Sequence, residues 1–226
     1  MIKRHSSVGR DFSDEQVLWK YYSLEHFLWL IQNKALYFGR ADRYEDKREI
    51  LATNLHAKLF YYNDLESLQR DVERDKPHIF LNCWTMSEHE SILMWKAYSN
   101  INNGVVIKTN ANRLMASYSG DASITIGKVK YIDEETQSAQ PFGQELNWLN
   151  LVFSKLWFYS DEKELRLYFD DRVQRLQHKV PVDLNILIDE IRLSPKVDPN
   201  SRQIIYDTLS SEGIDLKVRQ SDIEIE

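Results

Sequence analysis

The segment Phe153–Phe169 most constrains the fold, because its second half alternates between apolar and charged side chains. Side chains repeat every two residues along a β-strand, so the two sets fall on opposite sides of an extended chain. The apolar side consists of Leu165, Leu167 and Phe169. The polar side consists of Glu162, Glu164, Arg166 and Tyr168. Such a polar file either lines a cleft, where it could support a reaction, or faces open water as an ordinary charged strand face.

The composition is typical of a folded, aromatic-rich chain without disulfides. Its 226 residues suit one large domain or one and a half ordinary ones. Six Trp, twelve Tyr and nine Phe favour a packed core over disorder. The single cysteine, Cys83, excludes an internal disulfide and a cysteine-based zinc site, and it is compatible with a reducing cytosol. The six histidines show no pairing at metal-ligand spacing, so we expect no zinc.

The charge balance and the lack of long apolar runs narrow the possible partners. Lys and Arg number 29 and Asp and Glu number 35, a formal net charge of -6. This mild acidity argues against a large nucleic-acid footprint, although it is compatible with a local basic groove. The first residues lead into no apolar run, and no stretch reaches about 18 apolar residues. We therefore expect no signal peptide, no membrane span and a cytoplasmic location.

Local patterns predict an α+β fold. Strands are expected at 17–22, 35–38, 78–84, 105–108, 124–126, 128–132, 162–169, 191–194 and 214–219. Helices are expected at 24–31, 50–75, 92–98, 145–154, 184–190 and 199–212. These elements predict a mostly antiparallel mixed sheet with flanking helices and a C-terminal β-α-β unit within 179–226. We expect residues 1–13 to form a polar arm and residues 14–226 to form a single domain.

Three blocks of residues resemble a bacterial and phage family. The first block consists of Leu18–Tyr21, Ala35–Phe38 and Asp46–Glu49. The second consists of Cys83–Ser87, Met94–Tyr98 and Asn103–Ile107. The third is Glu162–Leu167. Together they resemble the family known as domain of unknown function 2971 (DUF2971), over nearly the whole chain. That resemblance implies no function.

A second resemblance concerns the order of three motifs. Lys20 lies on an early strand, Thr85–Ser87 lie at a strand end, and Glu162-x-Glu164 lies on a late strand. This order is similar to that of ADP-ribosyltransferases, so it implies NAD as the ligand and a macromolecular acceptor, and it suggests a toxin or phage-defence effector. Such enzymes need no glycine-rich dinucleotide loop, and the sequence contains none.

The resemblance also implies roles for individual residues. Cleavage of the nicotinamide–ribose bond builds positive charge on the ribose, which the carboxylate of Glu164 would stabilise. Glu162 would orient or deprotonate the acceptor, and Arg166 completes the candidate catalytic set. The candidate cofactor-binding residues are Lys20 or Arg40 for the pyrophosphate, Tyr21 or Trp95 for ring stacking, and Ser87 for a ribose hydroxyl.

Each of these residues also has a structural interpretation. Ser87 followed by Glu90 forms a capping-box pattern at the start of a helix. Trp95 lies at helical spacing on an apolar helix, which is typical of a core residue. Glu164 and Arg166 could be two members of a cross-strand ion-pair ladder.

Two other functions stay open from the sequence. In a metal-dependent nuclease, Asp46 together with Glu162 or Glu164 would bind a divalent ion next to the basic Arg166. In a non-catalytic recognition module, the polar file would form a binding groove.

Overall fold

The computed structural model describes residues 1–6, 11–44, 49–50, 56–57, 61, 63–133, 149–172 and 179–225. The chain divides into two compact units, each built from three segments. Unit 1 consists of Met1–Phe12, Phe38–Cys83 and Ala122–Lys179, and unit 2 consists of Ser13–Tyr37, Trp84–Asp121 and Val180–Glu226. Strand β5 (Ile79–Met86) crosses from unit 1 to unit 2 between Cys83 and Trp84.

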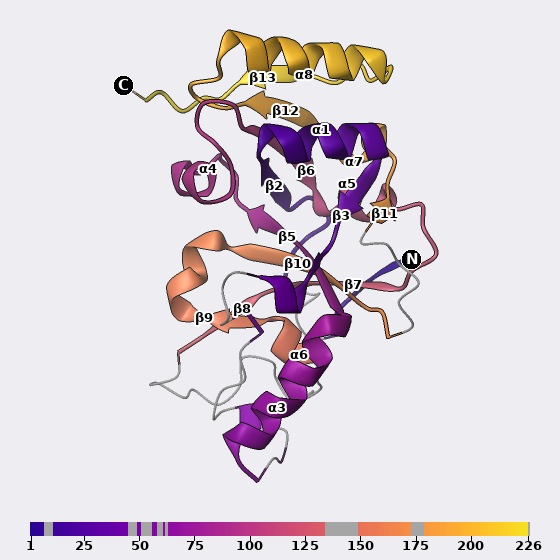
Figure 1. The fold of residues 1–226 in the computed structure, drawn as a ribbon, viewed down its shortest axis with the longest axis vertical. Coiled ribbons are helices and arrows are strands. Elements are labelled where there is room, and N and C mark those ends of the chain that lie inside the picture. The colour runs from indigo at the N-terminus through magenta and orange to yellow at the C-terminus, as the bar shows by residue number, and fades with distance from the viewer. Residues whose placement is uncertain are drawn as a thin grey trace. The chain divides into compact units, whose positions relative to one another are not determined.

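Unit 1 is built on strands that are far apart in sequence (Figure 1). In its sheet, β1 (Ile2–Arg4) pairs in parallel with β7 (Ile124–Lys128), and β7 pairs antiparallel with β10 (Glu164–Asp170). The first residues of β5 neighbour β10 and pair with β4 (Gly39–Arg40). A separate parallel pair joins β8 (Lys130–Ile132) to β9 (Ser154–Leu156). The helices whose bounds the structure describes here are α3 (Leu65–Asp75), α6 (Leu149–Val152) and the 3-10 helices η2 (Ala41–Arg43), η3 (Lys76–His78) and η4 (Trp157–Glu162).

The core of unit 1 explains why β10 is buried on both of its faces. Phe169 stacks on Phe80 at 5.0 Å between ring centroids and packs against Phe38 at 5.1 Å. Tyr168, on the opposite face of the strand, packs in a cluster with Leu68 and Val72 of α3 and with Leu151–Phe153. Every residue of β10 except Asp170 is buried.

Unit 2 contains the remaining strands in the order β5, β2, β6, β12 and β13. Strand β2 (Val17–Tyr22) pairs antiparallel with β5 and with β6 (Val105–Asn110), and β6 pairs antiparallel with β12 (Glu190–Leu193). A small second sheet joins β3 (Ala35–Tyr37) to β11 (Lys179–Pro181). The helices are α1 (Leu24–Asn33), α4 (Ile92–Tyr98), α5 (Ala111–Ala116), α7 (Leu184–Leu187) and α8 (Pro199–Ser211).

The C-terminal β-α-β unit forms as predicted. Strand β12 leads into α8, and β13 (Val218–Gln220) returns to pair in parallel with β12 (Figure 1). Asp198 caps α8 by accepting a hydrogen bond from the backbone N–H of Ser201, and Pro199 occupies the first helical turn. Gly213 follows the helix with a φ of 65°, a conformation that glycine adopts without steric cost.

The predicted fold class is confirmed, since helices flank a mixed sheet whose pairs are mostly antiparallel. Residues 1–13, for which we expected a polar arm, include strand β1. Within the helix expected at 50–75, the structure describes α3, and residues 145–148 of another expected helix lie outside the described residues. Among the described residues, no helix combines the length and the hydropathy that a bilayer crossing needs.

The start of α4 differs from the predicted capping box. The cap is Ser91, whose Oγ accepts a hydrogen bond from the backbone N–H of Met94, and not Ser87. The Ser87 Oγ instead accepts a bond from the backbone N–H of His89 in the preceding turn. Glu90, the expected partner of Ser87, is turned inward and binds Arg192 and the Trp95 indole. A buried ion pair therefore overrides the local capping pattern.

This assignment predicts different effects for the two serines. Ser91→Ala should lower the free energy of unfolding by about 1 kcal/mol, because it removes a helix cap. Ser87→Ala should have a smaller effect, since it removes only one turn hydrogen bond. Urea denaturation of both variants followed by circular dichroism measures the difference, and a larger loss for Ser87→Ala would contradict the assignment.

Candidate functional site

Two of the predicted catalytic residues lie at the buried start of β10. The exposed fractions of Glu164 and Arg166 are 3% and 0%, so the polar file does not face open water. Glu162 does not continue the strand, because it ends η4 and is separated from β10 by Lys163. Lys163 has a left-handed backbone with a φ of 45°, which is uncommon for a residue other than glycine. The predicted single file is therefore interrupted, and Tyr168 at its other end belongs to the core.

Arg166 is the centre of the site. Its Nε donates to Glu164 Oε1 at 2.6 Å and its Nη2 donates to Glu164 Oε2 at 3.1 Å, so the guanidinium holds this carboxylate by two bonds. Its Nη2 also donates to Glu49 Oε1 at 2.5 Å, and its Nη1 donates to the carbonyl oxygen of Val152 at 2.5 Å. A guanidinium without solvent contact needs such a full set of acceptors.

Lys155 of β9 is the second cation of the site. Its Nζ lies 2.7 Å from Glu162 Oε2, 3.2 Å from Glu49 Oε2 and 3.7 Å from Glu164 Oε2. It also lies 4.5 Å from the ring centroid of Tyr159. Lys155 thus brings Glu162 and Glu164 together although the two carboxylates do not share a strand.

Sequence reasoning missed both Lys155 and Glu49. In the sequence, Glu49 stood out only as the last residue of the block Asp46–Glu49, whereas the structure buries it against Arg166 and Lys155. The only sequence signal for Lys155 is its position as the sole charged residue in the apolar run Leu151–Tyr159. A lone lysine in such a run has to find carboxylate partners when it is buried.

Neighbouring opposite charges keep Glu164 and Lys155 ionised despite their burial. Burial alone would raise the pKa of Glu164, but the charge and hydrogen bonds of Arg166, together with Lys155, outweigh burial and lower this pKa to about 2. Burial would lower the pKa of Lys155, but Glu164, Glu49 and Glu162 raise it above its usual value. Three carboxylates and two cations leave one formal negative charge in the cluster.

Two aromatic side chains are exposed beside this cluster. Trp157 and Phe158 open η4, the 3-10 helix that ends at Glu162, and their exposed fractions are 57% and 45%. Their rings meet edge to face at 6.1 Å between centroids. The 3-10 helix that ends at Glu162 therefore carries an aromatic surface that solvent can reach.

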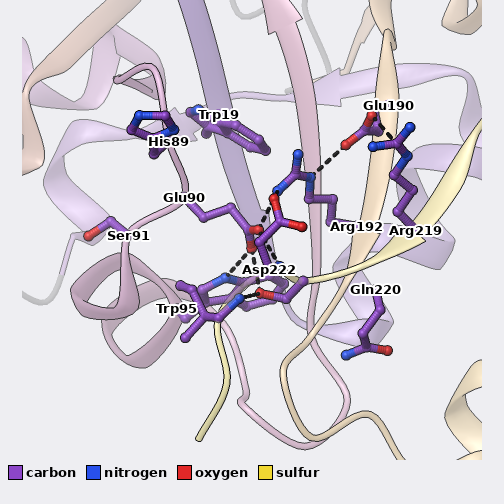
Figure 2. Close-up of polar contacts among 12 residues, drawn as sticks. Trp19, His89, Glu90, Ser91, Trp95, Glu190, Arg192, Arg219, Gln220 and Asp222 are labelled. Carbon is purple, nitrogen blue, oxygen red and sulfur yellow. Dashed lines mark hydrogen bonds and ion pairs between the residues drawn. The ribbon is translucent and has the colours of Figure 1, made fainter.

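The candidate cofactor-binding residues are distributed between the units. Arg40, in unit 1, donates two hydrogen bonds to Asp42 at 2.6 and 2.9 Å. Lys20, Tyr21, Ser87 and Trp95 lie in unit 2. The buried rings of Tyr21 and Trp95 meet edge to face at 5.3 Å, and Figure 2 shows the indole of Trp95 directed toward Glu90.

The candidates in unit 2 do not form one set. Lys20 and Tyr21 are neighbours on β2, so their side chains point to opposite faces of the sheet. Lys20 Nζ lies 5.7 Å from the ring of Trp84 and 5.8 Å from that of Tyr22. The proposed roles of these residues in binding NAD stay predictions.

The described residues give little support for a metal-dependent nuclease. None of their His, Cys, Asp and Glu side chains form a group of three or more that could hold a metal ion. Glu162 and Glu164, the proposed ligands, are bound by Lys155 and Arg166 instead. Asp46, the third proposed ligand, lies outside the described residues.

A buried histidine–serine contact near the site is not arranged for nucleophilic catalysis. His56 Nε2 lies 3.2 Å from Ser154 Oγ, and burial lowers the pKa of His56 to about 4. The Ser154 hydroxyl donates its proton to the carbonyl oxygen of Asn150 at 2.6 Å. His56 therefore donates to Ser154, whereas a general base would have to accept the serine proton.

Comparisons with known proteins do not assign a family. No protein-family model matches the chain, and no curated protein sequence matches it, so the resemblance to DUF2971 gains no support. The structure of Thermus sp. 2.9 DarT in complex with NAD+ is similar with a TM-score of 0.42 and 8% identity, over 92% of this chain and 96% of that chain. The complex of the same protein with carba-NAD+ gives a TM-score of 0.42 and 8% identity, over 93% of this chain and 97% of that chain. Similarity at this level shows neither a shared family nor a shared function.

The lowered pKa of Glu164 predicts a specific acid sensitivity. The unfolded state takes up a proton near pH 4.5 and the folded state only near pH 2. The stability that this group contributes is therefore complete above pH 4.5 and is lost as the pH falls toward 2. The full effect is about 3 kcal/mol.

Urea unfolding at several pH values between 5 and 2 tests this prediction. Glu164→Gln should show a shallower loss of stability with falling pH than the wild type. The exposed Glu66, which pairs with Arg70 on α3, supplies the control, and Glu66→Gln should retain the wild-type slope. Equal slopes for wild type and Glu164→Gln would show that Glu164 is not held ionised.

Proposed function

We propose that the protein is an NAD-dependent ADP-ribosyltransferase-like enzyme in which Glu164 stabilises the transition state. The observation that carries this proposal is the fixed, ionised carboxylate of Glu164 at the start of a late strand, with Glu162 held near it by Lys155. Preorganised charge of this kind is the usual means of stabilising a developing charge in an enzyme. The order of the sequence motifs agrees with this function.

The proposed reaction is the transfer of ADP-ribose from NAD to an acceptor. The bond between ribose C1′ and the nicotinamide nitrogen breaks, and neutral nicotinamide leaves with the bonding electron pair. The ribose becomes oxocarbenium-like, and the Glu164 carboxylate stabilises its positive charge. The acceptor nucleophile then bonds to C1′ and passes its proton to Glu162.

The ion-pair cluster suits this division of roles. Glu164 is buried and bound by both cations, so its charge and position are fixed. Glu162 is bound by Lys155, and 15% of its side chain is exposed, so solvent reaches it more readily than Glu164. Arg166 acts as a positioning residue for Glu164. Trp157 and Phe158, on the same 3-10 helix as Glu162, offer an exposed ring surface for a planar group of the ligand or the acceptor.

One observation favours a non-catalytic alternative. The carboxylates of Glu49, Glu162 and Glu164 all have cationic partners within the cluster, and this arrangement is also that of a structural ion-pair network. In that case Trp157 and Phe158 would mark a recognition surface, and the protein would bind a partner without chemistry.

Nicotinamide release separates the two functions. The wild type should release nicotinamide from NAD, and Glu164→Gln should reduce kcat by roughly a hundredfold or more with little change in KM, because the charge acts mainly in the transition state. Glu162→Gln should reduce transfer of labelled ADP-ribose to the acceptor more than it reduces nicotinamide release. Circular dichroism checks that both variants are folded.

Two outcomes would contradict the proposal. One is wild-type protein that releases no nicotinamide in the presence of a cell extract that supplies acceptors. The other is a folded Glu164→Gln variant with wild-type activity. If the enzyme acts as a toxin or phage-defence effector, its expression should slow the growth of cells and Glu164→Gln should relieve this effect.

A further inference from the structure

One face of the sheet in unit 2 carries charged side chains around a tryptophan. Trp19 of β2 lies opposite Lys108 of β6, which in turn lies opposite Glu190 of β12. Arg192 lies two residues beyond Glu190 on the same face. The Arg192 Cζ is 5.1 Å and the Lys108 Nζ is 5.7 Å from the Trp19 ring. Two cations thus share one aromatic ring.

A buried carboxylate attaches the C-terminal segment to this face. Glu90 Oε1 accepts from Arg192 Nη1 at 2.5 Å and from the backbone N–H of Asp222 at 2.9 Å. Glu90 Oε2 accepts from Trp95 Nε1 at 2.9 Å and from Ser221 Oγ at 2.7 Å. These bonds place the side chain of Asp222 next to Arg192 (Figure 2).

Arg192 is held on one side and reaches solvent on the other. Its Nε donates to Glu190 Oε1 at 2.5 Å, and its Nη1 donates to Glu90 and to Asp222 Oδ2, the latter also at 2.5 Å. Its Nη2 makes no hydrogen bond to any residue that the structure describes. The side chain of Glu90 is 2% exposed and that of Glu190 is 5% exposed, whereas that of Asp222 is 77% exposed. Asp222 is therefore the partner that can leave Arg192 at least cost.

Further cations surround this position. Lys217 Nζ lies 2.8 Å and Arg219 Nε 3.7 Å from Glu190 Oε2, and both side chains are more than half exposed. The group therefore holds four cations, Lys108, Arg192, Lys217 and Arg219, against the three carboxylates of Glu90, Glu190 and Asp222. Without the Asp222 carboxylate, the formal net charge of this group would rise from +1 to +2. Figure 2 shows Arg219 beside Glu190 and Asp222 beside Arg192.

We propose that Arg192 is the centre of an anion-binding site for a phosphate group, and that Asp222 is an internal competitor that occupies it. A guanidinium binds phosphate oxygens through two of its nitrogens. Here Nη2 is available, and the Nη1 hydrogen that Asp222 accepts becomes available when Asp222 leaves. Lys108, over the same tryptophan ring, would contact a second phosphate oxygen. The site lies entirely within unit 2 and does not depend on the transferase activity proposed for Glu164.

Titration with inorganic pyrophosphate tests this site. Calorimetry should show that Asp222→Asn binds pyrophosphate roughly fivefold more tightly than the wild type, because an exposed competing ion pair has been removed. Adding Arg192→Lys to Asp222→Asn should abolish this gain, since lysine keeps the charge but lacks the fork. The lysine still provides a cation for Glu90 and Glu190, and circular dichroism checks the fold of each variant.

The matched control is Asp207→Asn on α8. Asp207 accepts a hydrogen bond from Gln203, and its replacement changes the net charge by the same amount as Asp222→Asn. Asp207→Asn should bind pyrophosphate like the wild type. An equal gain in both variants would assign the effect to net charge and overturn the proposal. The proposal also fails if Asp222→Asn does not bind pyrophosphate or if the double variant keeps the gain.

A second ligand distinguishes the sources of the phosphate. A nucleoside diphosphate should show the same dependence on Asp222 and Arg192 as pyrophosphate does. Tighter binding of the nucleoside diphosphate would assign the site to nucleotides, and equal binding would assign it to the phosphate groups alone. A nucleoside diphosphate whose binding is unaffected by both substitutions would contradict the site.

Discussion

The complete burial of the Arg166 guanidinium is the constraint on which the organisation of unit 1 depends. A buried charge is tolerated only when its donors have acceptors, and removing one partner of a buried pair typically costs about 3–5 kcal/mol. Three groups accept hydrogen bonds from Arg166. Glu164 lies on the same strand, the Val152 carbonyl lies at the end of α6, and Glu49 lies more than a hundred residues earlier in the chain. Lys155 then attaches Glu162 to the same carboxylates. The candidate site is thus a consequence of how the protein buries one arginine.

Local periodicity was sufficient to predict β10 and its polar pair, because period-two alternation is a property of neighbouring residues. The C-terminal β-α-β unit was likewise predictable from Pro199 and Gly213, which mark the ends of a helix. The roles of Lys155 and Glu49 as partners of this pair could not be predicted, since an ion pair between distant segments leaves no local pattern in the sequence. The break at Lys163 was also missed, because a lysine gives no sign of a left-handed backbone.

Ser87 and Glu90 show how a correct local pattern can be overridden. A helix cap contributes about 1 kcal/mol to stability, and Glu90 could complete a capping box with Ser87 if its side chain were exposed. Glu90 instead accepts four hydrogen bonds in the interior of unit 2, where leaving Arg192 unpaired would cost more than the cap contributes. The helix keeps a cap because Ser91 is available one residue later. Local motifs therefore predict an element better than they predict the role of each residue at its end.

The same Glu-x-Arg device occurs once in each unit. Glu164 and Glu190 each accept a hydrogen bond from the Nε of the arginine two residues later, at 2.6 and 2.5 Å, because alternate residues of a strand share a face. The difference lies in the remaining acceptors. Arg166 is closed off by Glu49 and a backbone carbonyl, whereas Arg192 is completed by Asp222, which faces solvent. A closed arginine can only position a carboxylate, but one with an exposed partner can exchange that partner for a ligand. The pattern in sequence is identical, so the other partners of each guanidinium, and not the pattern, distinguish Arg166 from the binding role proposed for Arg192.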